Sequence, residues 1–117
     1  MSSVDYKAYL LYGHELGVAK IDEKIEMILD EEVDSIGGID CDDIIGNWLY
    51  DTFRGDNYIA VEIAKVYEDE VEEIADFEKA VKEAQEKLQE FYRKIGGFTY
   101  SETDKDNVIL LLDSGVR

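Results

Sequence analysis

Residues 68–95 read EDEVEEIADFEKAVKEAQEKLQEFYRKI and carry the strongest structural signal in the chain. They are rich in Glu, Lys, Ala and Gln, contain no Gly or Pro, and precede Gly96 and Gly97, so they predict one long helix that ends at the glycines. The apolar residues recur at alternating steps of three and four, the spacing of a coiled coil or of two closely packed helices. This apolar seam consists of Ile74, Phe77, Val81, Ala84, Leu88, Phe91 and Ile95.

Three other segments have clear patterns. Residues 5–13, DYKAYLLYG, alternate along their length and are rich in aromatic and apolar residues, which predicts a strand. Residues 21–33 repeat Ile, Leu and Val at helical spacing, which predicts a helix that Gly37 and Gly38 bring to an end. Residues 108–112, VILLL, predict a strand buried on both faces, or buried on one face with a dimer contact on the other.

The segment between residues 40 and 66 allows two interpretations. Residues 44–53 and 58–64 could be two strands around a glycine-containing turn, and this hairpin is the interpretation we favour. Alternatively, Asp40 caps a helix that places Ile44, Ile45, Trp48 and Leu49 on one face.

In this order the segments predict a single α+β domain over residues 1–117, with the ferredoxin-like order βαββαβ and two helices on one face of a four-stranded antiparallel sheet. A 28-residue helix would be about 42 Å long, whereas a seven-residue strand spans roughly 23 Å. Part of the 68–95 helix should therefore overhang the sheet. Either its seam forms a homodimer or partner contact, or it packs on the 21–33 helix; the residues concerned are Val81, Leu88, Phe91 and Ile95.

Nearly all of the net charge of −17 comes from two segments. Residues 22–43 contain ten acids and one base, and residues 62–78 contain eight acids and one base, while the rest is nearly neutral. Clustered carboxylates repel phosphate groups and attract cationic protein surfaces. The sequence thus predicts a basic protein partner, and disfavours direct binding of nucleic acid or of an anionic membrane. A salt-adapted protein would instead spread its acids over the whole chain.

No motif for catalysis, metal binding or cofactor binding accompanies the charge. His14 is the only histidine, and a turn histidine bonded to Glu15 or to the backbone explains it better than a catalytic base. Cys41 stands among three aspartates, whose charge disfavours the thiolate, so we expect an inert thiol. Calcium-loop spacing and a phosphate-binding glycine loop are both absent. We therefore predict no enzyme, no cofactor and no metal.

No segment of the chain has the length of a membrane span, and residues 1–20 lack the pattern of a secretory signal, so a cytoplasmic location is expected. Tyr6, Tyr9, Tyr12 and Tyr58 could stack on RNA bases in a domain of this topology. The basic residues that accompany such aromatics are missing, so we expect these tyrosines in the core or in a protein contact.

The acids suggest a function as a nucleic-acid mimic, in which carboxylates occupy places where a target protein expects phosphates. Acids three or four apart on a helix lie roughly 5 to 6 Å from one another, similar to phosphates along one strand. If the two predicted helices lie side by side, their acidic rows form one ridge. The predicted partner-binding residues are Asp22, Glu26, Asp30, Glu68, Asp69, Glu72, Glu73 and Asp76.

In size and charge the chain resembles the small acidic proteins by which bacteriophages disable host nucleases, restriction enzymes or CRISPR complexes. The resemblance lies in composition alone. It implies an inhibitor that acts in the host-cell cytoplasm, and it assigns no role to any single residue. The alternative is an acidic interaction or assembly subunit that forms a dimer and has no inhibitory role.

Overall fold

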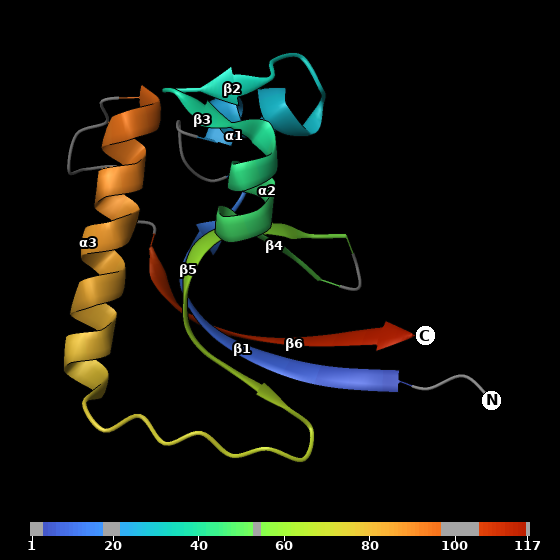
Figure 1. Cartoon of the computed structure of the whole chain (residues 1–117), viewed down its shortest axis with the longest axis vertical. Coiled ribbons are helices and arrows are strands. Elements are labelled where there is room, and N and C mark those ends of the chain that lie inside the picture. Colours follow the sequence, from blue (N-terminus) through green and yellow to red (C-terminus); the bar gives the residue numbers. More distant parts are fainter. Residues whose placement is uncertain (1–3, 18–21, 53–54, 97–105, 117) are drawn as a thin grey trace.

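A computed structural model describes residues 4–17, 22–52, 55–96 and 106–116 of the protein (Figure 1). Four strands form one antiparallel sheet in the order β4-β5-β1-β6. A separate two-stranded hairpin and three helices are the other elements within these described ranges. The sheet strands are β1 (Val4–Glu15), β4 (Leu49–Asp51), β5 (Asn57–Tyr67) and β6 (Asn107–Val116); the hairpin is β2 (Ser35–Ile36) and β3 (Ile39–Asp40); the helices are α1 (Asp22–Leu29), α2 (Cys41–Trp48) and α3 (Phe77–Gly96).

Strand β1 lies inside the sheet, between β5 and β6, as its alternating aromatic and apolar residues lead one to expect. Near its end Gly13 pairs with Ala60 of β5. A Cβ atom at this glycine would lie 2.0 Å from the carbonyl oxygen of Ile59, so no larger residue fits without moving the two strands apart. The end of β1 is thereby held tightly against β5.

Helix α3 packs against β5 and β1 on one face of the sheet (Figure 1). The main core lies between them and also takes in α1 and α2: Ile25, Ile28 and Ile44 belong to the same buried cluster as Leu88 and Phe91. A hydrogen bond from Gln85 of α3 to the hydroxyl of Tyr12 on β1, at 2.9 Å, adds a polar contact across this layer. The opposite face of the sheet carries a smaller cluster of Leu11, Ala60 and Leu111, against which Tyr9, Tyr50, Tyr58 and Ile109 pack.

The predicted helix over residues 68–95 is wrong at its start. Helix α3 begins at Phe77, because the side chain of Asp76 accepts a hydrogen bond from the N–H of Lys79 at 3.0 Å and so caps the first turn. Residues 68–76 are non-helical, and a helix there would have set Glu68 four residues from Glu72 on one face, which like-charge repulsion disfavours. The overhang inferred from the longer helix is therefore absent.

The apolar seam is filled within one chain over most of α3, although Phe77 at the start of the helix is 44% exposed. Leu88, Phe91 and Ile95 are buried, and Val81 is partly buried against the same core. The spacing allowed either a dimer or partner contact or packing within the chain, and the structure has the packing within the chain. The seam belongs to the same core as residues of the sheet, of α2 and of α1. Leu88, Phe91 and Ile95 are thus not available as the surface of a dimer through α3.

The segment that follows α1 also differs from prediction. Helix α1 ends at Leu29, before Val33, and Gly37 and Gly38 do not end a helix but form the two-residue turn of the β2–β3 hairpin. Both glycines have positive φ values, 58° and 81°, as the favoured hairpin turns require. The helical alternative is confirmed as α2, although Asp40 makes no side-chain capping bond. Of the favoured strand over residues 44–53, the structure has only β4, which pairs with β5.

The predicted class is confirmed: the protein is a small α+β domain with a four-stranded antiparallel sheet and helices. Between α1 and β4 the chain has three elements that the predicted order lacked, namely β2, β3 and α2. The predicted strand over residues 108–112 is confirmed within β6, but it lies at an edge of the sheet. Leu111 is buried, whereas Leu110 and Leu112 are exposed, so this strand is covered on one face only.

Candidate functional site

One end of the molecule, which we call the acidic end, is built from α1, the β2–β3 hairpin and α2, all at the top of Figure 1. Every carboxylate between residues 23 and 43 is exposed there, whereas Ile25, Ile28 and Ile44 of the same elements turn inward to the core. The same stretch contains only one base, Lys24. The exposed acids are Glu23, Glu26, Asp30, Glu31, Glu32, Asp34, Asp40, Asp42 and Asp43.

The acidic end is fixed to the C-terminal end of α3 by two contacts. The ammonium group of Lys24, which is half-buried, donates a hydrogen bond to the carbonyl oxygen of Ile95 at 3.0 Å. Gly37 approaches α3 so closely that a Cβ atom would lie 2.0 Å from the carbonyl oxygen of Lys94. The elements that carry the carboxylates of the acidic end are therefore held in place by packing against α3.

The local charge affects Cys41 at the start of α2. Desolvation, followed by the carboxylates of Asp42 and Asp34, raises the pKa of this thiol above its usual range. The direction agrees with the inert thiol expected from the sequence, since only the thiolate is a strong nucleophile.

A groove of about 800 Å³ separates α2 from α3 beside the acidic end. At its floor the rings of Trp48 and Phe91 are stacked, with centroids 4.1 Å apart and planes 11° from parallel. Phe91 is buried and Trp48 is half-buried, so the indole ring is the aromatic surface that the groove presents. The charged residues of the groove are Asp43, Glu83, Glu86 and Glu90 together with Lys87 and Lys94.

The predicted acidic ridge does not form. Glu26 and Asp30 belong to the acidic end, whereas residues 68–76 lie at the opposite end of the longest axis of the molecule, at the bottom of Figure 1. Five of the predicted residues are in this second segment and are exposed there: Glu68, Asp69, Glu72, Glu73 and Asp76. The two acidic segments are thus separate surfaces, and the structure brings together only the acids within each.

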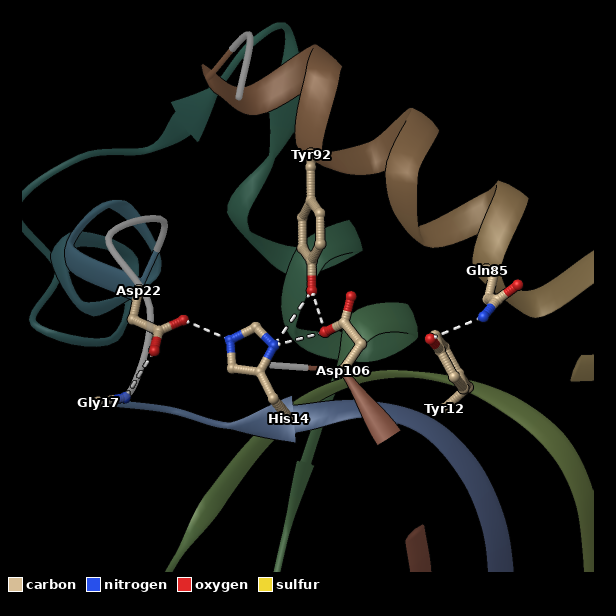
Figure 2. Close-up of polar contacts among 7 residues, drawn as sticks. All are labelled: Tyr12, His14, Gly17, Asp22, Gln85, Tyr92 and Asp106. Atoms are coloured by element: carbon tan, nitrogen blue, oxygen red, sulfur yellow. Dashed lines mark hydrogen bonds and ion pairs between the residues drawn. The ribbon is translucent and has the colours of Figure 1, made fainter. Parts of the chain in front are cut away.

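Asp22 departs furthest from its predicted place, since it is buried and forms part of a polar cluster with the only histidine (Figure 2). His14 lies between two carboxylates: its Nε2 donates to Asp22 and its Nδ1 to Asp106, both at 2.8 Å. The hydroxyl of Tyr92 donates to the same Asp106 oxygen at 2.9 Å. The other oxygen of Asp22 accepts the N–H of Gly17 at 2.7 Å.

A histidine with a carboxylate at each ring nitrogen is held as the imidazolium ion, because only that form donates from both nitrogens. Burial lowers the pKa of His14, but the hydrogen bonds and charges of Asp106 and Asp22 outweigh it and raise the pKa to about 9. Burial and the neighbouring Asp106 likewise raise the pKa of the Tyr92 hydroxyl. The cluster is a buried polar link between β1, α1, α3 and the residue just before β6, and His14 at its centre is only 3% exposed. The turn histidine predicted from the sequence is wrong, since His14 is part of β1 and bonds to neither of the predicted partners.

The raised pKa predicts a dependence of stability on pH. A group whose pKa is higher in the folded state stabilises the fold below its unfolded pKa and loses that contribution as the pH rises through the folded value. The free energy of unfolding should therefore fall by about 3 kcal/mol between pH 6.5 and about 9. Urea denaturation at these two pH values measures it. The variant His14→Asn is the control, because it keeps every other titrating group and should lack this part of the decrease; an equal decrease in both proteins would contradict the assignment.

Sequence reasoning missed both sites that depend on distant pairs. Asp106 lies 92 residues from His14, and Trp48 lies 43 residues from Phe91, so no local spacing links them. One signal was available: an acid at the predicted start of a helix eight residues after the only histidine, which Asp22 satisfies.

Among the residues that the structure describes, no group of three or more His, Cys, Asp or Glu side chains is arranged to hold a metal ion. No helix in the described ranges is long and apolar enough to cross a membrane. Comparisons of the chain with models of protein families, with curated proteins and with solved structures find no match.

Proposed function

We propose that the protein binds a cationic segment of a partner protein at its acidic end. The observation that carries the proposal is the gathering of nine exposed carboxylates on α1, the β2–β3 hairpin, α2 and the connection between α1 and β2. The only base of this stretch, Lys24, is half-buried and bonded to Ile95. Such a surface attracts cations at long range and accelerates their association.

The groove between α2 and α3 gives this surface a place for one particular side chain. An arginine or lysine of the partner can lie over the indole ring of Trp48, where the face of the aromatic system attracts a cation. Asp43 from α2 and Glu86 from α3 also line the groove and supply the opposite charge. Lys87 and Lys94 also line the groove and reduce its negative charge. We expect arginine to bind better than lysine there, because its planar guanidinium group can bond a carboxylate while it stacks on the ring.

The partner class that fits best is a nucleic-acid-binding protein, and the action we propose is inhibition by nucleic-acid mimicry in the cytoplasm. A basic site that normally holds phosphates would accept the carboxylates of α1 and α2 instead. Once such a partner has been isolated, the protein and a DNA or RNA ligand should compete for the same site on it. A competition gel-shift experiment measures this. If the partner binds the protein and the nucleic acid at the same time, the mimicry proposal is wrong, and the protein is an interaction subunit without this inhibitory role.

Binding at the acidic end can be tested through Trp48, which is the only tryptophan in the chain. An oligo-arginine peptide should change the emission of Trp48 in a saturable manner, and the citrulline peptide of equal length should not. Replacing Asp43 by Asn and Glu86 by Gln should weaken the affinity about two- to fivefold for each carboxylate. Raising NaCl from about 0.05 to 0.5 M should weaken it further by screening.

The matched control replaces Glu72 and Glu73 by Gln at the opposite end of the molecule, which removes the same charge and should leave the Trp48 titration nearly unchanged. If this control loses as much affinity as the variant of the groove, binding depends on net charge alone and the proposed site is incorrect.

We also propose that the domain is a ferredoxin-like fold with an insertion. In the sheet order β4-β5-β1-β6, strand β5 separates β1 from β4, and β1 separates β5 from β6. This strand order is the one that two split βαβ units produce, and in the proposed fold α1 and α3 are their helices. Elements β2, β3 and α2 are then the insertion, and they carry much of the acidic end.

A further inference from the structure

Strand β6 forms one edge of the sheet and exposes leucines there. It pairs with β1 on one side, and none of the described strands pairs with its other side. Leu110 is 75% exposed and Leu112 is 66% exposed, and Val108 on the same face is also exposed. These three residues, which we call the β6 strip, share the face of the sheet on which α3 packs, since they pair with Leu10, Ala8 and Tyr12 of β1.

An edge of this kind is unusual in a protein that remains a monomer. Natural proteins protect their edge strands with lysine, proline, bulges or a covering element, because free N–H and C=O groups readily pair with another strand. Residues 108–112 contain no charged residue and no proline. The hollows beside the strip are lined by Leu10, Ile74 and Phe77 and by charges of both signs that balance, namely Glu72, Glu78, Lys65 and Lys82. A contiguous apolar surface at a free edge marks an interaction site.

We propose that the β6 strip pairs with the same strip of a second copy, forming an antiparallel homodimer centred on Leu110. In this register Leu110 lies opposite itself, Leu112 lies opposite Val108, and Leu111 lies opposite Ile109. All five residues of the apolar run therefore meet apolar residues, on both faces of the sheet. The one acid between residues 107 and 113, Asp113, falls opposite Asn107 and not opposite another acid.

The charge distribution favours a second copy at this edge. Residues 79–117 contain seven acids and seven bases, so the whole net charge of −17 resides in residues 1–78. Two such chains repel each other at their acidic surfaces but can approach through a neutral strand. A cationic partner, in contrast, gains no attraction from the neutral β6 strip. The dimer is thus independent of the proposed binding at the acidic end, and it leaves that end free.

Sedimentation velocity at high micromolar concentration tests the dimer. The wild type should sediment with twice its monomer mass of 13.4 kDa. Replacing Leu110 by Lys should produce the monomer at the same concentration, because two ammonium groups would then face each other across the symmetry axis. Added salt should strengthen the dimer, since it screens the repulsion between two negative chains. Binding of cationic peptides at the acidic end has the opposite salt dependence.

The matched control is Val71→Lys, which introduces the same side chain at a residue that is 89% exposed and lies outside β6. It should leave the dimer intact. If the wild-type protein remains a monomer, the proposal is wrong. The edge of β6 would then pair with a strand from a different protein. Equal effects of Leu110→Lys and Val71→Lys also overturn it, because charge and not the strip would then set the association. Far-UV circular dichroism confirms that both variants are folded.

Discussion

Replacing His14 by Ala is expected to lower the free energy of unfolding by about 3 to 5 kcal/mol, the usual loss when one member of a buried ionic cluster is removed. The reason is that Asp22 and Asp106 remain buried after the imidazolium ion is gone, and two carboxylates then face each other without the cation that separated them. A loss of that size is a large fraction of the total stability of about 5 to 15 kcal/mol for a typical domain. Thermal and urea denaturation at neutral pH measure it.

The control for this variant is Tyr92→Phe, which removes one hydroxyl from the same cluster and keeps the ion triplet. Its expected cost is about 1 to 3 kcal/mol, because a single buried donor is lost and no charge is left uncompensated. If His14→Ala costs no more than Tyr92→Phe, the histidine is neutral in the folded state and the charge assignment is wrong.

Replacing Leu88 by Ala is expected to destabilise the protein by about 2 to 5 kcal/mol through the lost apolar contacts and the cavity that remains. Leu88 is fully buried in the main core between α3, the sheet and the other helices. The exposed residue Lys82 on the same helix is the control, and Lys82→Ala should change the free energy of unfolding by no more than about 0.5 kcal/mol. Denaturation curves of both variants test the prediction.

The Leu88 variant also separates two explanations of the apolar seam. A seam that served a dimer would lose association and keep a stable monomer when Leu88 is truncated. The buried position predicts the reverse: lower stability, and a sedimentation coefficient of the folded protein that matches the wild type.

The inner face of α3 could be predicted because its apolar spacing and its glycine stop are local features of the sequence. The start of α3 could have been predicted from Asp76, whose carboxylate caps the helix. The dense run of Glu and Asp before it has high helix propensity residue by residue, and that propensity concealed the repulsion among like charges four positions apart. Here the capping bond and the repulsion outweigh the propensity.

The segment around α2 shows a different reason for error. Trp48 and Leu49 fit a helical face and a strand equally well, and the chain uses both, because α2 ends at Trp48 and β4 begins at Leu49. Gly37 and Gly38 are typical both of a helix end and of a hairpin turn. Which of the two structures they form depends on the close approach of Gly37 to α3. Tertiary contact settles such cases, and a sequence does not display it.

The two acidic segments were evident from composition, but their separation was not. Side-by-side helices would have joined Glu26 to Glu72 in one surface, whereas the structure sets α1 and residues 68–76 at opposite ends. The aromatic floor of the groove and the cluster around His14 depend in the same way on which elements the sheet brings together. For this chain, the residue types of the candidate site were predictable and their arrangement was not.

The pairing of β1 with β6 has a consequence for the synthesis of the protein. Strand β1 leaves the ribosome before the other described strands, yet one of its edges stays open until residues 107–116 emerge. His14 likewise lacks its partner Asp106 until then. Contacts between residues so far apart in the chain form slowly. The nascent chain therefore completes its four-stranded sheet only after residues 107–116 have emerged. Until then one edge of an apolar strand stays exposed, and chaperones shield such edges.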